Sequence, residues 1–193
     1  MLLHLIRHAE ASADHGGDPP LSERGVRQAE LLPDALRDSA PVRILHSSSH
    51  RARQTADIVS RGLGAVPVEV CSWARDLTPF PSDDSESYPS HALTWLSATP
   101  PAERDPGSEQ LTDALQGLLD LSAAQPLAVV THAYVVAWFT AHLLGASPSA
   151  WLRLPVDNAS ITTVARNRFG EVVLHRFNWT CRPGFLASVP GPP

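Results

Sequence analysis

The chain contains no lysine, and all 15 of its cationic side chains are arginines. This absence excludes several kinds of active site. A P-loop needs a Gly-Lys-Ser/Thr sequence, a protein kinase needs a strand lysine, and Schiff-base chemistry needs an amine. A Gly-x-Ser-x-Gly nucleophile elbow is missing as well. Serine nucleophiles and lysine-dependent phosphate sites are therefore disfavoured.

Cysteine is also scarce, with only Cys71 and Cys181 present. Two cysteines build no disulfide framework and match no metal-ligand spacing, so we expect buried or incidental thiols. Cys71 lacks the arginine six positions further on that a cysteine phosphatase would need. The nine histidines are scattered through the chain and fit no metal-site spacing. We therefore expect neither a metal nor a cofactor.

Long hydrophobic runs are absent too. No apolar run reaches the roughly 18 residues that a membrane span needs. The opening run MLLHLI is short and lacks the cationic start of a secretory signal, so we expect a cytoplasmic protein with no membrane partner. The net charge of −5 and the lack of a basic run disfavour binding to nucleic acid.

Apolar periodicity predicts strands that alternate with helices. The predicted strands are 2–6, 42–45, 66–70, 127–130, 161–165 and 172–177, and the predicted helices are 22–36, 50–63, 109–124 and 135–144. Pro33 should kink or split the first helix, whose apolar side includes Val26. This order implies an α/β fold, a three-layer sandwich whose mostly parallel, doubly wound sheet has helices on both faces.

The segment 77–107 differs from the rest of the chain because it is rich in proline and serine and acidic at its centre. One short helix near 91–96 is plausible within it. Long segments with little structure of their own are often functional, so we expect an insertion or flap over the site. The length suits one domain over 1–180, followed by an irregular tail over 181–193.

Arg7 and His8 follow the first predicted strand, His132 follows the strand 127–130, and Arg51 begins a helix after Ser47-Ser48-Ser49. The carboxyl ends of parallel strands meet at one edge of a sheet, where such folds bind ligands. An arginine fork grips phosphate, and a neutral imidazole can attack phosphorus. We therefore expect these two histidines and two arginines to converge.

Five ordered motifs carry a family resemblance. They are RHAE (7–10), LSERGVRQAE (21–30), SSSHRARQTA (47–56), VVTHA (129–133) and DNASITTV (157–164). Together they resemble the histidine phosphatase superfamily, also called phosphoglycerate mutase-like, over roughly residues 2–178. The resemblance implies a phosphoglycerate mutase-like fold. It also implies a metal-independent phosphatase that hydrolyses a phosphomonoester or a phosphoprotein through a phosphohistidine intermediate.

The resemblance also implies roles for individual residues. His8 matches the nucleophile that becomes phosphorylated. Arg7, Arg51 and His132 match the phosphate pocket, which also includes Ala133. A nucleophilic imidazole must be neutral and hold one tautomer, so we expect the other ring nitrogen of His8 to donate to a backbone carbonyl. Arg53 lies two positions beyond Arg51 and should point elsewhere.

A leaving alkoxide needs a proton donor. The family usually supplies a glutamate shortly after the third strand, and Asp76 occupies that position here. The acidic residues of the flap, Asp83, Asp84 and Glu86, are the other candidates. Asp76 could equally be a helix cap or a solvated carboxylate.

Glu10 and Tyr134 are candidates for contact with the substrate, although packing is an equally good interpretation for Tyr134. Alanine replaces the usual first-motif glycine at position 9, Ala133-Tyr134 replaces the Gly-Gly that often follows the second histidine, and the spacing from RHAE to LSERG is short. Together these departures favour the compact, SixA-like phosphatases of the family. The sequence PGSEQL (106–111) points instead to the small-molecule branch. Two alternatives stay open, namely a low-turnover module that binds a phosphorylated ligand and a phosphoglycerate mutase-type phosphotransferase.

Overall fold

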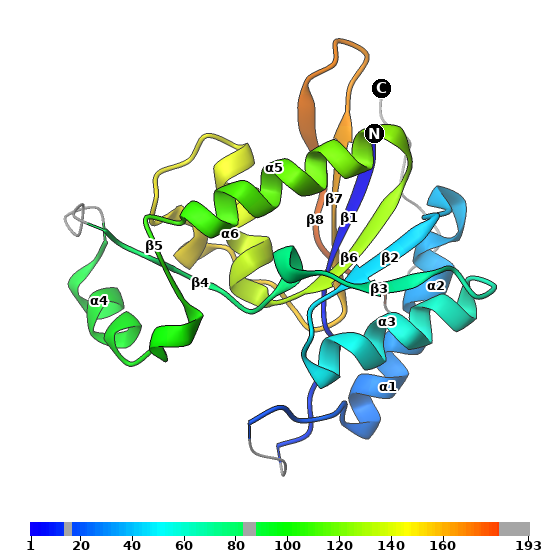
Figure 1. Cartoon of the computed structure of the whole chain (residues 1–193), viewed down its shortest axis with the longest axis horizontal. Coiled ribbons are helices and arrows are strands. Elements are labelled where there is room, and N and C mark those ends of the chain that lie inside the picture. The colour runs from blue at the N-terminus through cyan, green and yellow to red at the C-terminus, as the bar shows by residue number, and fades with distance from the viewer. Residues whose placement is uncertain (14–16, 83–87, 182–193) are drawn as a thin grey trace.

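The computed structural model describes residues 1–13, 17–82 and 88–181. A six-stranded sheet in the order β3-β2-β6-β1-β7-β8 forms its centre (Figure 1). The strands are β1 (Leu2–Arg7), β2 (Arg43–His46), β3 (Val68–Val70), β6 (Leu127–Thr131), β7 (Ser160–Arg166) and β8 (Val172–Thr180). The first four strands of that order run parallel, and β7 and β8 are antiparallel additions. The predicted, mostly parallel sheet is confirmed.

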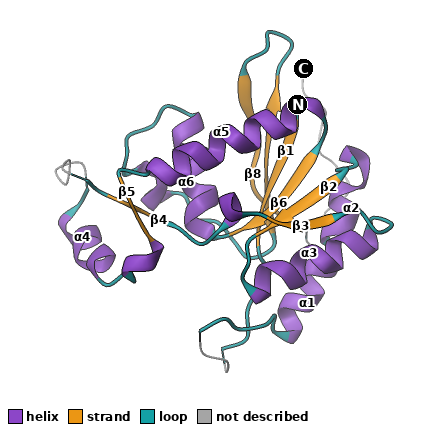
Figure 2. Cartoon of the chain, in the orientation of Figure 1, coloured by secondary structure: helices purple, strands orange, loops and turns teal. Residues whose placement is uncertain are grey.

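Helices cover both faces of this sheet (Figure 2). One face carries α1 (Glu23–Glu30), α2 (Leu32–Leu36) and α3 (His50–Gly62), and the other carries α5 (Glu109–Ala124) and α6 (Ala133–Leu143). Short 3-10 helices η1 (Arg37–Ser39), η2 (Ser72–Ala74), η4 (Pro101–Glu103) and η5 (Ala150–Arg153) lie between these elements. The three-layer architecture is therefore as predicted. No helix of the described ranges is long and apolar enough to cross a membrane.

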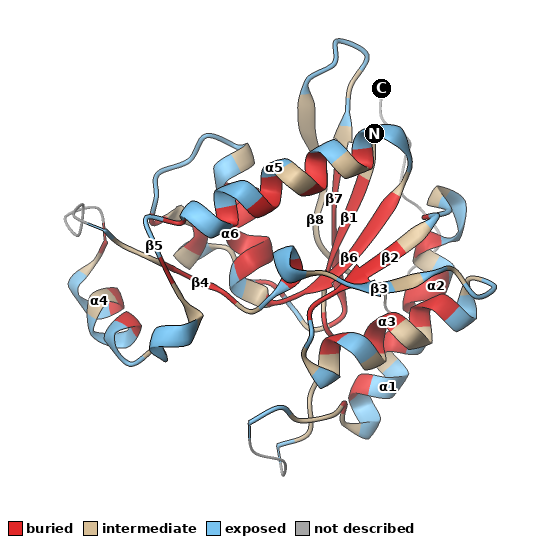
Figure 3. Ribbon diagram, viewed as in Figure 1, coloured by how far each residue is buried: buried red, intermediate tan, exposed pale blue. Residues whose placement is uncertain are grey.

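Strand side chains alternate between two cores, as the period of two in a β-strand requires. Leu3 and Leu5 of β1 pack with α5 and α6, whereas Ile6 packs with α1, α2 and α3. The same alternation divides β6 between the two cores. Both cores are fully buried, and the red strands at the centre of Figure 3 show this. The buried strands therefore hold the residues that directly follow them in fixed positions at the edge of the sheet.

The helix predicted over 22–36 is split, as Pro33 suggested, into α1 and α2, with Pro33 in the first turn of α2. Ser22 caps α1 by accepting a hydrogen bond from the Gly25 amide. A Cβ on Gly25 would collide with the carbonyl oxygen of Glu10, so only glycine lets α1 approach the loop after β1 so closely. The placement of Val26 on the apolar side was wrong, because Val26 is exposed.

The segment 77–107 contains more structure than the sequence predicted. Its helix, α4 (Ser90–Ser97), agrees with the prediction, but β4 (Thr78–Phe80) and β5 (Arg104–Pro106) also pair as a two-stranded parallel sheet. Three-residue strands that each contain a proline show no alternation, so periodicity could not reveal them. Figure 1 shows α4, β4 and β5 to one side of the main sheet.

Candidate active site

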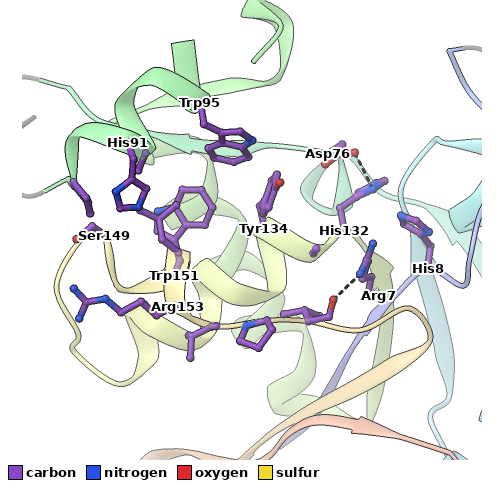
Figure 4. A pocket seen from close by; sticks show the side chains of 17 residues that line it. Arg7, His8, Asp76, His91, Trp95, His132, Tyr134, Ser149, Trp151 and Arg153 are labelled. Carbon is purple, nitrogen blue, oxygen red and sulfur yellow. Dashed lines mark hydrogen bonds and ion pairs between the residues drawn. The ribbon is translucent and has the colours of Figure 1, made fainter. Parts of the chain in front are cut away.

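His8 and His132 lie side by side because β1 and β6 are neighbours in the sheet. Each histidine directly follows its strand, and Arg7 pairs with Thr131 in the parallel register. The backbone amide of His8 donates to the Thr131 carbonyl at 2.9 Å. The two imidazole rings have centroids 5.2 Å apart. The predicted meeting of strand ends is confirmed, and Figure 4 shows both rings at one end of a pocket.

His8 is held in one tautomer. Its Nδ1 lies 2.8 Å from the carbonyl oxygen of Ala9, an acceptor, so Nδ1 carries the proton and donates. Its Nε2 therefore presents a lone pair, and Nε of Arg51 donates to that nitrogen at 3.1 Å. Asn158 fixes the backbone by donating from its side-chain amide to the His8 carbonyl at 3.1 Å. The expected hydrogen bond to a backbone carbonyl is present.

The imidazole of His8 is also kept neutral. Burial lowers its pKa to about 3, and the nearby charges of His132, Arg51 and Arg7 act in the same direction. The hydrogen bond to the Ala9 carbonyl opposes this shift but does not overcome it. A neutral ring whose Nε2 is unprotonated is the form that can act as a nucleophile.

Arg51 connects the cluster. It lies in the first turn of α3, after Ser49 at the N-cap. Besides contacting His8, its Nη2 donates to Oδ2 of Asp76 at 2.8 Å and lies 3.3 Å from Nδ1 of His132. Its Nη1 lies 3.6 Å from Oδ1 of Asp18. This guanidinium therefore touches both histidines and two carboxylates.

Asp76 sits against the same groups. Its Oδ2 lies 3.0 Å from Nδ1 of His132, whose Nε2 is 2.9 Å from the hydroxyl of Ser47. Burial acts to raise the pKa of Asp76, but the hydrogen bond from His132 and the charges of His132, Arg51 and His8 together lower it. Asp76 is therefore ionised when the site holds no anion. Among the described residues, its Oδ1 has no hydrogen-bond partner.

Arg7 offers a second guanidinium. Its Nη1 donates to the carbonyl oxygen of Val156 at 2.6 Å, which anchors the side chain. Its Nε is buried and has no partner within the described part of the chain. A buried donor without a partner costs free energy, so this N–H group is well suited to donate a hydrogen bond to an anionic oxygen.

A cavity of about 870 Å³ begins at this cluster and extends towards α4 and η5. Arg7, His8, Asp76 and His132 lie at one end of it. Ala133 and Tyr134, in the first turn of α6, also line it. The remaining lining residues are Pro89, His91, Ala92, Trp95, Ser149, Trp151, Leu152, Arg153, Leu154, Pro155 and Val156.

Glu10 does not line this cavity. Its carboxylate accepts a hydrogen bond from Ser22 at 2.9 Å and pairs with Arg24 at 3.1 Å, and it lines a separate pocket. In the structure, these partners hold the Glu10 side chain outside the cavity that His8 lines. Arg53 pairs with Asp57 at 3.8 Å on the surface, pointing elsewhere as expected.

The other proton-donor candidates, at positions 83, 84 and 86, lie outside the described residues, as do positions 182–193 of the tail predicted over 181–193. Within the described ranges, no group of three or more His, Cys, Asp or Glu side chains is arranged to hold a metal ion. Several site residues were not identified from the sequence as such: Asp18, Ser47, Asn158, Trp95 and Trp151. Ser47 and Asn158 do lie inside the quoted motifs, whereas no pattern marks Asp18, Trp95 or Trp151.

A neutral, oriented imidazole next to two guanidinium groups, at the carboxyl edge of a parallel sheet, defines a site for phosphoryl transfer. Comparison with known proteins specifies the class further. The chain belongs to the histidine phosphatase superfamily (branch 1), whose family pattern matches residues 3–180.

Curated relatives agree with this membership. Adenosylcobalamin/alpha-ribazole phosphatase of Salmonella typhimurium is 31% identical over 167 residues, which cover 75% of this chain and 80% of that protein. A Yersinia pestis protein named "Probable phosphoglycerate mutase GpmB" is 29% identical over 84% of this chain and 83% of its own length. Both the family and the first of these relatives support a phosphatase.

Solved structures share the fold. The alpha-ribazole phosphatase of Shigella flexneri superposes with a TM-score of 0.71 at 24% identity, over 93% of this chain and 96% of that chain. A mycobacterial glucosyl-3-phosphoglycerate phosphatase gives a TM-score of 0.69 at 21% identity, over 92% and 98% of the two chains. The predicted phosphoglycerate mutase-like architecture is confirmed.

Proposed function

We propose that the protein hydrolyses phosphomonoesters of small molecules through a phosphorylated His8. The observation that carries this proposal is the state of the His8 ring. Its Nδ1 is bonded to the Ala9 carbonyl, its pKa is far below neutrality, and its Nε2 faces Arg51. A nucleophile in this state needs no deprotonation before it attacks phosphorus.

In the first step, the Nε2 lone pair of His8 attacks phosphorus and the ester P–O bond breaks. Arg7 and Arg51, with His132 and the amide end of α6 at Ala133, stabilise the charge on the phosphoryl oxygens. The leaving alkoxide takes a proton from Asp76. In the second step, a water molecule attacks the phosphohistidine and returns a proton to Asp76, which releases inorganic phosphate and restores neutral His8.

The contacts that lower the pKa of Asp76 in the free protein change when a substrate binds, and this change would let Asp76 act as an acid. A phosphate dianion draws hydrogen bonds from Arg51 and His132, two of the three groups that lower the pKa of Asp76. The dianion also adds negative charge nearby, and both changes raise the pKa of the carboxyl group. Asp76 then takes up a proton only when a substrate is bound, with Oδ1 available to deliver it.

The test is to trap the intermediate. The protein is mixed with 4-nitrophenyl phosphate, quenched in alkali within the first turnover, and digested for mass spectrometry. We expect an acid-labile phosphate on His8 and none on His46, which is equally buried and makes the same kind of Nδ1 contact, 2.7 Å from the Ser47 carbonyl. His8→Asn should abolish turnover while retaining the native circular dichroism spectrum. Native-like turnover by this variant would refute the proposal.

A mutase is the second candidate, because one curated relative carries that name. Hydrolysis and transfer differ in the acceptor of the phosphoryl group, which is water in one case and a second substrate hydroxyl in the other. Incubation with 3-phosphoglycerate and product analysis by ³¹P NMR separates the two. We expect inorganic phosphate, whereas accumulation of 2-phosphoglycerate without phosphate release would identify the mutase.

A further inference from the structure

Beyond its phosphate end, the cavity has an aromatic wall built by three separate elements. Trp95 comes from α4, Tyr134 from α6 and Trp151 from η5. The ring centroids of Tyr134 lie 5.3 Å from those of both Trp95 and Trp151, with interplanar angles of 85° and 63°. Figure 4 shows the three side chains together, with Tyr134 on the side nearest His132.

The three rings are not equivalent. Trp151 is only 2% exposed, and its indole N–H donates to the Tyr88 hydroxyl at 3.3 Å. That hydroxyl in turn donates to the Pro148 carbonyl at 3.2 Å. Trp151 is therefore held in place beneath the other two rings, and its indole N–H already has a hydrogen-bond partner. The contact also ties the start of the α4 region to the loop before η5.

Trp95 and Tyr134, in contrast, leave much of their ring surface uncovered. They are 42% and 38% exposed although both line a concave cavity. Core aromatic residues of this protein, such as Phe139, are fully buried. Large apolar surface that stays open inside a pocket is typical of a ligand-binding wall.

The surroundings are mostly apolar. Pro89, Ala92, Leu152 and Leu154 line this part of the cavity together with the polar side chains of His91, Ser149 and Arg153, and among the described lining residues Asp76 is the only carboxylate. Tyr134 lies two positions after His132, in the first turn of α6, so the aromatic wall begins directly beside the phosphate end. A ring bound here would be joined to the phosphate through a short linker.

We propose that Trp95 and Tyr134, supported by Trp151, form a subsite for an aromatic or heteroaromatic ring in the leaving group of the phosphomonoester. Aromatic rings favour edge-to-face and offset stacked neighbours, which this pair of nearly perpendicular rings offers from two directions. This inference rests on the proposed phosphatase activity and specifies its substrate class.

The test compares three alkyl phosphates whose leaving alcohols have similar acidity: propyl, 3-cyclohexylpropyl and 3-phenylpropyl phosphate. We expect kcat/KM to be about 5- to 160-fold higher for 3-phenylpropyl than for propyl phosphate, the range that one stacked ring provides. The cyclohexyl compound should fall well below the phenyl compound. Equal kcat/KM for phenyl and cyclohexyl compounds would overturn an aromatic subsite in favour of a merely apolar one.

Substitutions show which residues cause the preference for 3-phenylpropyl phosphate. Trp95→Ala should reduce the ratio of kcat/KM between 3-phenylpropyl and propyl phosphate to within about threefold of unity, whereas Trp95→Phe should retain most of it. Phe169→Ala is the matched control, because it removes an aromatic side chain that is 72% exposed in the turn between β7 and β8. It should leave the ratio unchanged, and thermal melts should show that each variant is folded.

The outcomes separate this inference from the proposed function. Absence of phosphate release from every ester, including 4-nitrophenyl phosphate, would refute the phosphatase itself. Hydrolysis of all three alkyl phosphates at equal kcat/KM would leave the phosphatase standing and overturn the ring subsite. A preference for the phenyl compound that survives Trp95→Ala and Tyr134→Ala would also overturn the assignment.

Discussion

Replacing Asp76 with asparagine separates proton donation from the positioning of the groups around it. In the structure, Arg51 and His132 both contact Oδ2 of Asp76, at 2.8 and 3.0 Å. Asparagine has nearly the same shape and can still accept one of these hydrogen bonds through its amide oxygen. It carries no charge, however, and cannot give a proton to a leaving alkoxide.

The size of the effect follows from these two roles. Losing one hydrogen bond to a charged group weakens the site by about 1.5 kcal/mol, or roughly tenfold, for every substrate. Losing a general acid lowers the rate a further 10²- to 10⁴-fold, roughly, but only where the leaving group needs protonation. We therefore expect Asp76→Asn to reduce kcat on propyl phosphate at least tenfold more than kcat on 4-nitrophenyl phosphate, which leaves as a stable phenolate.

The assay measures kcat/KM for a series of aryl and alkyl phosphates and plots it against the pKa of the leaving group. Asp76→Asn should steepen this dependence. The matched control is Asp18→Asn, since Asp18 also pairs with Arg51, at 3.6 Å, yet does not line the cavity. Its loss, if any, should be the same for all leaving groups. Parallel plots for wild type and Asp76→Asn would refute proton donation and reduce Asp76 to a positioning residue.

Three other features of the fold give sharp tests. Arg51→Gln should lower kcat/KM roughly 10²- to 10³-fold and weaken inhibition by vanadate, whereas Arg53→Gln, changing a surface ion pair, should alter neither. Burial lowers the pKa of His4 to about 4, so the unfolded chain takes up a proton below about pH 6.5 that the native state refuses. Urea denaturation at pH 7.5 and pH 5 should therefore show a smaller loss of stability for His4→Gln than for wild type, and equal losses would contradict this account. Gly25→Ala should lower the midpoint of urea denaturation well below that of Gly64→Ala, because a Cβ meets backbone only at Gly25, while position 64 has open space and only a positive φ to accommodate. Equal midpoints for the two variants would contradict the close approach of α1.

Arg7, His8 and His132 could be placed from the sequence because of one geometric rule. Parallel strands end at the same edge of a sheet, so residues that directly follow two such strands lie at that edge, and they touch when the two strands are neighbours. The sequence places His8 and His132 at one edge, but it does not reveal that β6 lies between β2 and β1, the order that brings the two rings into contact. Arg51 obeys the same rule, since α3 begins shortly after β2.

Residues that follow no strand end were harder to assign. Glu10 stands in the same motif as His8, yet Ser22 and Arg24 turn its carboxylate outward. Contacts of this kind depend on how α1 docks, which no local pattern encodes. Trp95 lines the cavity from α4, and the Tyr88 hydroxyl ties the chain before α4 to the loop before η5, 60 residues away in the sequence. Non-local packing of this kind leaves no periodicity to read.

Asp76 lies beside His132 and Arg51 for a structural reason that the sequence does not show. The expected landmark was the third strand, yet β3 is a three-residue edge strand whose last residue, Val70, is 66% exposed. The carboxylate is instead located from β6. The buried hydroxyl of Thr131 donates to the Ala74 carbonyl at 2.8 Å and so fixes the end of η2 two residues before Asp76. One residue of β6, Thr131, therefore fixes the end of η2, and the next residue, His132, contacts the Asp76 carboxylate together with Arg51, so the position of Asp76 depends on the end of β6 and on the start of α3.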